Sequence, residues 1–164
     1  MKGIKLGLEI EEKFLLSALP TNIEKSEKHL VQYYLFVDES FECRIRLIFN
    51  GKTPRYILGF KIGKGKVRIE DEHEIPKQVF EELKKKCLGC IDKFRYEFID
   101  NDQKWVIDQF ISETTKGWGL ILAETEFERQ GELYTVPTKI EKVLIKQVTY
   151  DESYKNKNLI LRSK

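Results

Sequence analysis

Charged residues of one sign recur at alternate positions in several short stretches of this chain. The same-sign pairs, each two residues apart, are Glu9 with Glu11, Arg44 with Arg46, Glu70 with Glu72, Lys93 with Arg95, and Glu124 with Glu126. Residues i and i+2 of a β-strand lie on one side of it, about 6.6–7 Å apart. Like charges at this spacing repel each other and add nothing to stability by themselves. The pairs therefore favour a binding role over a structural one.

Strands of this kind would form one cationic wall and one anionic wall. Arginine binds phosphate oxygens through two parallel hydrogen bonds. Carboxylates bind hard cations such as Mg²⁺ or Mn²⁺ through their oxygen atoms. A polyphosphate that carries such a metal satisfies both walls. The alternative is that the strands turn their charged faces to water, and no single Glu-x-Glu motif distinguishes the two.

The elements that carry these residues have a period of two. Alternating or β-branched and aromatic residues mark eight segments: 4–16, 29–38, 41–50, 55–62, 66–75, 91–100, 104–113 and 118–128. Turn residues separate several of them, such as Asn50-Gly51, Gly63-Lys64-Gly65 and Asn101-Asp102. The pattern predicts a mainly β fold, an antiparallel sheet of eight strands. A sheet of this size usually closes or folds over, so we expect a barrel.

Short helices are expected outside this barrel. One begins at Pro76 and runs to Lys86, and a second covers residues 137–145, where Ile140, Val143 and Leu144 share one side. The chain has 164 residues and contains no linker or internal repeat, which predicts a single domain over residues 1–164.

The composition excludes several classes of protein. A net charge of +2 with 34% charged residues leaves no strongly basic face for a nucleic acid. The three cysteines, Cys43, Cys87 and Cys90, argue against a complete disulfide framework and for a reducing compartment. No signal peptide and no run of 18 apolar residues is present, so no membrane span is expected. We therefore expect a cytoplasmic protein.

The charged motifs resemble those of a known family. The opening Glu9-Ile10-Glu11-Glu12-Lys13 resembles the E-x-E-x-K signature of CYTH domains, also called triphosphate tunnel metalloenzymes. Further segments resemble the family in the same order: Arg44-Ile45-Arg46, Phe60-Lys61, Arg68-Ile69-Glu70-Asp71-Glu72, Lys93-Phe94-Arg95-Tyr96, the Asp108 strand, Ala123-Glu124-Thr125-Glu126-Phe127, and Val148-Thr149-Tyr150-Asp151 with Tyr154-Lys155-Asn156. Each motif is modest alone, but the ordered set covers residues 5–160.

The resemblance implies an eight-stranded antiparallel tunnel and a role for each charged residue. It implies Mg²⁺ or Mn²⁺ ligands at Glu9, Glu11, Glu124 and Glu126, and phosphate-binding bases at Arg44, Arg46, Lys61, Arg68, Lys93 and Arg95. Glu70, Glu72 and Asp108 would serve a second metal or orient the bases. Lys13 would activate water together with Tyr34, although Tyr33 adjoins it. Lys13 is a general base only if burial and neighbouring bases lower its pKa.

The implied activity is metal-dependent hydrolysis of a triphosphate, with inorganic tripolyphosphate yielding pyrophosphate and phosphate. The alternatives are a thiamine or nucleoside triphosphatase, a class IV adenylyl cyclase, a non-catalytic polyphosphate-binding module, and a β domain with a charged surface. The H-F motif near the start of the cyclases is absent, and Gln147 stands where members often carry Glu. The expected partner is a small triphosphate, with no nucleic acid or membrane. The protein itself would be a monomer or homodimer, and residues 150–164 could plug one tunnel mouth.

Overall fold

Ten antiparallel strands form one sheet in the computed structural model, which describes residues 5–8, 10–23, 27–64, 67–113 and 117–160. The strands are β1 Lys5–Leu8, β2 Ile10–Leu16, β3 Glu27–Val37, β4 Phe41–Phe49, β5 Arg55–Ile62, β6 Val67–Glu74, β7 Gly89–Asp100, β8 Gln103–Phe110, β9 Ile121–Phe127 and β10 Leu144–Gln147. Their order across the sheet is β1-β6-β5-β4-β3-β7-β8-β9-β2-β10. The expected mainly β, antiparallel fold is therefore confirmed.

In the described residues the sheet has ten strands, two more than predicted. Each of the eight predicted segments does contain a strand, but the first segment holds two, because β1 pairs with β6 while β2 pairs with β9. The additional strand β10 pairs with the other edge of β2. It takes up the end of the predicted helix over 137–145, so that α2 is only Thr138–Glu141.

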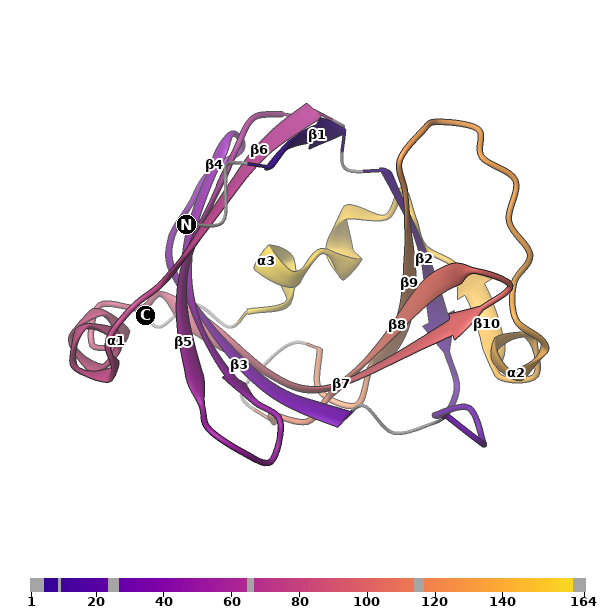
Figure 1. Cartoon of the computed structure of the whole chain (residues 1–164), viewed down its shortest axis with the longest axis horizontal. Coiled ribbons are helices and arrows are strands. Elements are labelled where there is room, and N and C mark those ends of the chain that lie inside the picture. Colours follow the sequence, from indigo (N-terminus) through magenta and orange to yellow (C-terminus); the bar gives the residue numbers. More distant parts are fainter. Residues whose placement is uncertain (1–4, 9, 24–26, 65–66, 114–116, 161–164) are drawn as a thin grey trace.

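The sheet curves around a central space, and its two ends approach each other (Figure 1). The strands β1 and β2 lie towards opposite ends of the strand order, yet only one residue separates Leu8 from Ile10 in the chain. The chain itself therefore joins the two sides of the curved sheet.

Tight turns of the predicted kind connect neighbouring strands. Asn101 and Asp102 join β7 to β8 and have φ values of 48° and 61°. Positive φ at both central residues is the requirement of a type I′ turn, whose twist matches that of the flanking strands. Gly51, between β4 and β5, has a φ of 84°, which a residue without a side chain adopts at little cost.

On one half of the ring the apolar face of the sheet points outward. Phe14, Trp105 and Ile107 from β2 and β8 pack there with Ile140 of α2, and Trp105, Ile107 and Ile140 are fully buried. Alternation along each strand then directs the remaining residues inward, among them Lys13 and Asp108. The hydrophobic core thus lies outside the sheet on this half, and polar residues are left for the interior.

Besides α2, the described residues form three short helical segments that pack against the sheet. The helix α1, Lys77–Lys84, lies against the outside, where Phe80 is buried beside Tyr33 and Tyr56. The 3₁₀ turn η1, Glu152–Tyr154, and the helix α3, Asn156–Leu159, follow β10 and pack inside the curve of the sheet (Figure 1). Within the described residues, no helix has the length and apolar character needed to cross a membrane.

Candidate active site

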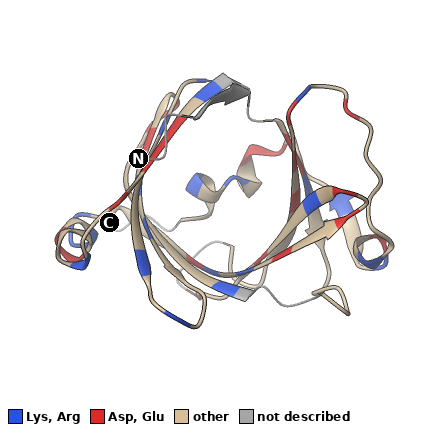
Figure 2. Ribbon diagram, viewed as in Figure 1, with Lys and Arg blue, Asp and Glu red and all other residues tan. Residues whose placement is uncertain are grey.

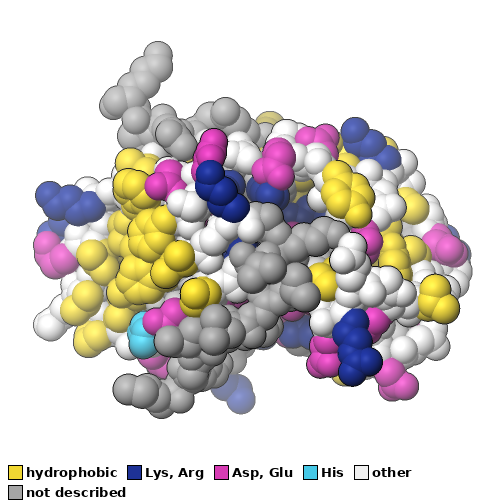
Figure 3. All heavy atoms as spheres, turned by 90° about the horizontal axis from the view of Figure 1, so that it is seen from above, with side chains coloured by type: hydrophobic (Ala, Val, Ile, Leu, Met, Phe, Trp, Pro, Cys, Tyr) yellow, Lys and Arg dark blue, Asp and Glu magenta, His cyan; other side chains and the backbone are white. Residues whose placement is uncertain are grey.

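A cavity of about 790 Å³ lies inside the curved sheet, and charged side chains from the inward face of the strands line it. Figure 2 shows bases and acids distributed along the strands around this space. In the view from above, Lys, Arg, Asp and Glu side chains gather beside one another near the middle of the face, and hydrophobic side chains lie to their left (Figure 3). The predicted site residues that line the cavity are Glu11, Lys13, Tyr34, Arg44, Arg46, Lys61, Arg68, Glu70, Glu72, Lys93, Arg95, Glu124 and Glu126. The alternative of charged faces turned to open water is therefore wrong for these strands.

Two predicted residues are not among the lining residues. Asp108 faces inward, but Lys93 and Arg95 bind its carboxylate, and only 1% of its surface is exposed. Glu9 lies outside the described residues. Among the residues that the structure describes, ten Lys and Arg and nine Glu residues line the cavity, so their two kinds of charge nearly balance.

The β7–β8 cluster consists of Lys93, Arg95 and Asp108. Lys93 Nζ donates to Asp108 Oδ2 at 2.5 Å, while Arg95 donates from Nε to Oδ1 at 2.7 Å and from Nη2 to Oδ2 at 2.8 Å. Burial opposes the charged form of Asp108, but its two cationic partners hold the pKa of this carboxyl far below its usual range. Burial, together with the charge of Arg95, lowers the pKa of Lys93 to about 8. One carboxylate thus holds two phosphate-binding candidates in place.

The β4–β6 cluster consists of Arg44 and Arg46 on β4 and Glu70 and Glu72 on β6. Arg44 Nη2 donates to Glu70 Oε1 at 2.9 Å, and Arg46 Nη2 donates to Glu72 Oε1 at 2.8 Å. Gly59 of β5 lies between Arg44 and Glu72 across the sheet. A Cβ atom at this position would lie 3.6 Å from Arg44 Nε, so a larger side chain would compete with Arg44 for the same space. Burial and the neighbouring Arg44 lower the pKa of Arg46 to about 10.

Two donors of the β4–β6 cluster remain unused. Arg44 Nε and Arg46 Nε are buried and have no hydrogen-bond partner among the described residues. A buried donor without a partner costs free energy, about 1–3 kcal/mol. A ligand oxygen in the cavity would remove this cost.

Acids and Lys13 meet where β2 pairs with β9. Glu11 lies directly opposite Glu126, and Lys13 lies opposite Glu124. Lys13 Nζ is 3.0 Å from Glu124 Oε1 and 3.7 Å from Glu11 Oε1. Burial would lower the pKa of Lys13, but the charges of Glu124 and Glu11 raise it above the ordinary value. The lowered pKa required of a general base is therefore not found in this arrangement.

Tyr34, not Tyr33, faces the cavity. Tyr34 is fully buried, its hydroxyl accepts a hydrogen bond from Gln32 Nε2 at 2.6 Å, and burial raises its pKa. Tyr33 faces the opposite way and packs on Phe80 of α1. Lys13 and Tyr34 thus line one cavity, although each side chain has a different partner.

The carboxylates of the cavity offer oxygen ligands of the kind that a hard divalent cation takes. Across the described part of the chain, no three or more His, Cys, Asp or Glu side chains form a group able to hold a metal ion. Glu11, Glu124 and Glu126 nevertheless belong to adjacent strands, and carboxylates placed directly opposite each other repel unless a cation lies between them. Carboxylate oxygens are the ligands that Mg²⁺ and Mn²⁺ prefer.

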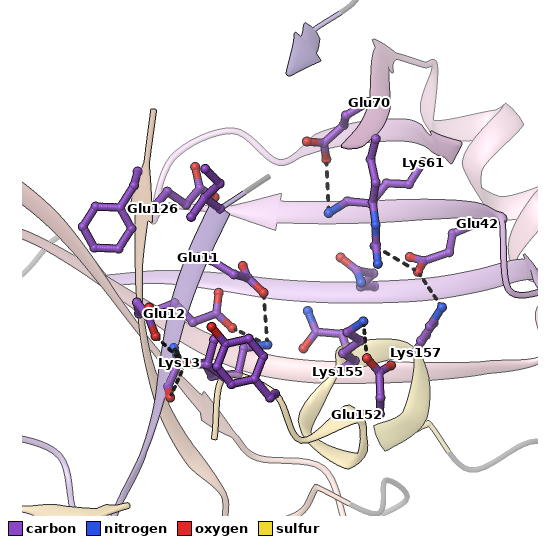
Figure 4. A pocket seen from close by; sticks show the side chains of 18 of the residues that line it. Glu11, Glu12, Lys13, Glu42, Lys61, Glu70, Glu126, Glu152, Lys155 and Lys157 are labelled. Carbon is purple, nitrogen blue, oxygen red and sulfur yellow. Dashed lines mark hydrogen bonds and ion pairs between the residues drawn. The ribbon is translucent and has the colours of Figure 1, made fainter. Parts of the chain in front are cut away.

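Sequence reasoning missed several lining residues, which Figure 4 shows around the pocket. Glu42 shares the inward face of β4 with Arg44 and Arg46, so the same alternation is the signal that could have found it. Lys155 and Lys157 come from the C-terminal segment, where no periodicity marks them. Lys157 Nζ lies 3.5 Å from Glu42 Oε1, and Lys155 Nζ lies 2.7 Å from Glu152 Oε1.

Gln147 has its own role beside the site. Its side-chain amide donates to Glu12 Oε2 and, at 3.0 Å, to Thr149 Oγ1. Thr149 Oγ1 in turn donates to Glu12 Oε2 at 2.6 Å and accepts from the backbone N–H of Lys13 at 3.0 Å. A carboxylate at position 147 would face Glu12, so the neutral amide avoids a repulsion between like charges.

Comparison with known proteins places the chain in a family. No family model matches it. The chain is 33% identical over 162 residues to an inorganic triphosphatase of Acetivibrio thermocellus, with 94% of each protein covered. It is 29% identical to the crystal structure of the inorganic triphosphatase NE1496, with a TM-score of 0.66 and 92% and 93% of the two chains covered. The HpAC1 protein of Hippeastrum, at 16% identity, a TM-score of 0.55 and 74% and 80% coverage, shares the fold. The chain belongs to the CYTH family, the triphosphate tunnel metalloenzymes.

Proposed function

We propose that this protein is a phosphoanhydride hydrolase that cleaves inorganic tripolyphosphate to pyrophosphate and phosphate with the help of a divalent metal. The observation that carries the proposal is the cavity, in which a cluster of partly unsatisfied arginines faces a corner of carboxylates. Similarity to two inorganic triphosphatases over nearly the whole chain supports the same substrate.

The proposal includes a closed tunnel within one domain, residues 1–164. If β1 and β2 are counted as one long strand and β10 as an addition at its edge, eight strands remain around the cavity. Pairing of this one strand with β6 on one side and β9 on the other supports the closure.

The metal, Mg²⁺ or Mn²⁺, would be held by Glu9, Glu11, Glu124 and Glu126. When bound, such a cation neutralises charge on phosphate oxygens as the phosphoanhydride bond breaks. Glu11 and Glu126 support this assignment because they stand opposite each other on paired strands.

The bases bind the phosphate oxygens and stabilise the charge that develops on them. Arg44, Arg46, Lys61, Arg68, Lys93 and Arg95 are assigned this role, since all six line the cavity. Asp108, Glu70 and Glu72 are assigned to orienting these bases, since each binds an Arg or Lys side chain, and the alternative is that they serve a second metal. Phosphoryl transfer needs little covalent chemistry from the protein, so positioning and charge supply most of the catalysis.

Lys13 and Tyr34 are assigned to the attacking water. The raised pKa of Lys13 favours an ammonium that binds and orients, and a cation on Glu11 and Glu124 would weaken the contacts that raise it. The variant Lys13→Met distinguishes the two roles. Loss of kcat supports activation of water, whereas an unchanged kcat with a raised KM makes Lys13 an electrostatic ligand.

The test of the function is release of phosphate from tripolyphosphate with and without Mg²⁺. The wild type should release phosphate only with the metal, and the double variant Glu9→Gln/Glu11→Gln should not. The matched control is Glu128→Gln, because Glu128 is exposed and is not a lining residue. Binding of tripolyphosphate without any release of phosphate would contradict the hydrolase and favour a polyphosphate-binding module.

A further inference from the structure

The inward face of β4 carries a carboxylate beside its two arginines. Glu42 lies on the inward face of β4 together with Arg44 and Arg46, and only 7% of its surface is exposed. Its Oε1 atom is 3.9 Å from Arg68 Nη1 and 3.5 Å from Lys157 Nζ. An acid in a row of phosphate-binding bases requires an explanation, because it repels the ligand that the bases attract.

Glu42 and Lys157 lie far from the carboxylates of β2 and β9. In Figure 4 they occupy the opposite side of the pocket from Glu11, Lys13 and Glu126. A phosphate chain held by a cation at Glu11 would therefore extend from that corner towards Glu42 and Lys157.

The large cavity narrows at this same place. Glu42, Lys61, Arg68 and Lys157 also border a shallow depression beside Asp38 and Glu39, which has no room for a water molecule. A chain longer than the cavity would therefore meet the Glu42–Lys157 pair, with further carboxylates behind it.

We infer that Glu42 and Lys157 set the length of the polyphosphate that the cavity accepts, with Glu42 rejecting a further phosphate and Lys157 limiting that rejection. The inference rests on the proposed function. Each added phosphate brings negative charge towards the Glu42 carboxylate, and a repulsive group of this kind is a recognised source of specificity. Lys157 neutralises part of that carboxylate and attracts phosphate itself.

The test compares tetrapolyphosphate with tripolyphosphate in the variants Glu42→Gln and Lys157→Gln. For Glu42→Gln, the ratio of kcat/KM for the tetramer to that for the trimer should rise about tenfold, because one repulsive charge is removed from a partly buried site. For Lys157→Gln, the same ratio should fall, since the repulsion by Glu42 is then uncompensated.

The opposite directions of the two effects distinguish charge from simple obstruction. If the C-terminal segment were only a steric plug held by the Glu42–Lys157 ion pair, either substitution would loosen it, and both ratios would rise. Equal directions, or ratios unchanged within about twofold, would overturn the inference. Lys85→Gln is the control, because Lys85 forms an exposed ion pair with Glu82 at the end of α1 and lies outside the cavity lining, so its loss should leave both ratios unchanged.

Affinities of the two polyphosphates, measured by calorimetry without divalent metal, separate this inference from the proposed function. If the wild type binds tripolyphosphate but never releases phosphate, the hydrolase proposal is wrong. The ratio of the affinities for the tetramer and the trimer, compared between the two variants, then still tests the role of Glu42. A wild type that binds the tetramer as tightly as the trimer overturns the inference even if hydrolysis is found.

Discussion

The β7–β8 cluster and the β4–β6 cluster both pair arginines with acids, but they hold those acids differently. Asp108 is 1% exposed and accepts three hydrogen bonds from Lys93 and Arg95. The side chains of Glu70 and Glu72 are 25% and 33% exposed. Each of their arginines keeps one buried Nε donor that has no hydrogen-bond partner in the described part of the chain.

The difference indicates two ways of preparing bases for a phosphate. A fully buried acid with several hydrogen bonds fixes its bases before the ligand arrives, which is preorganisation. Partly exposed acids with single hydrogen bonds can be displaced, and the incoming phosphate then takes their place on the arginines. We therefore expect the β7–β8 cluster to matter for folding and the β4–β6 cluster to matter for binding.

The largest effect is expected for Asp108→Asn. Removing one partner of a buried ion pair leaves uncompensated charge, which costs about 3–5 kcal/mol. The free energy of unfolding, measured in urea, should fall by this amount. Glu70→Gln is the matched change in the other cluster and should cost about 1 kcal/mol. Equal losses in the two variants would contradict the comparison.

Arg46→Lys should affect the ligand more than the fold. Lysine keeps the positive charge but loses the planar fork that binds a phosphate through two hydrogen bonds. We expect KM for tripolyphosphate to rise about tenfold, which corresponds to about 1.4 kcal/mol. The unfolding midpoint should change little. A large loss of stability with an unchanged KM would assign Arg46 to the fold.

Glu72→Gln should make stability depend more strongly on the ligand. Without this carboxylate, the repulsion between Arg44 and Arg46 is less compensated. The free energy of unfolding of the ligand-free protein should therefore fall by about 1 kcal/mol. Tripolyphosphate supplies the missing negative charge. The rise in Tm on adding tripolyphosphate should thus be larger in the variant than in the wild type, and an equal rise would show that Glu72 is not displaced.

The smallest effect concerns pH and Lys93. Its pKa is about 8 in the folded protein against the ordinary 10.5, so between these values the unfolded chain binds more protons than the folded one. The contribution of Lys93 to the free energy of unfolding therefore increases as pH rises, by somewhat less than ~1 kcal/mol between pH 7.5 and 8.5. Lys93→Met should remove that part of the pH dependence, measured by urea unfolding at the two pH values. An identical slope in both proteins would contradict the assignment.

The sequence allowed much of this arrangement to be predicted, because alternation determines which residues share a strand face. Arg44 and Arg46, or Glu124 and Glu126, could be grouped without knowledge of the fold. Alternation does not say which side chains on the inward face reach the cavity and which are covered by their neighbours. For Asp108 it therefore leaves open a second metal or a role in orienting bases, and the structure buries this acid beneath two bases.

Contacts between distant parts of the chain were not predictable in the same way. The strand β10 exists because Leu144–Gln147 completes an edge of β2, and its local apolar spacing resembles that of a helix. Lys157 reaches the cavity because Leu159 and Ile160 of its segment are buried against Tyr34 and Ile91. Neither contact leaves a periodic signal in its own segment.

The position of β2 has a consequence for the order of folding. Most neighbouring strands are close in sequence and can pair as hairpins, but β2 pairs with residues 121–127 and 144–147. Contacts of such large sequence separation form slowly, since a long loop must close before they are made. During synthesis the first long strand therefore waits for almost the whole chain to emerge. The carboxylates and the lysine that it carries enter the site late, so phosphate binding should report the last step of folding.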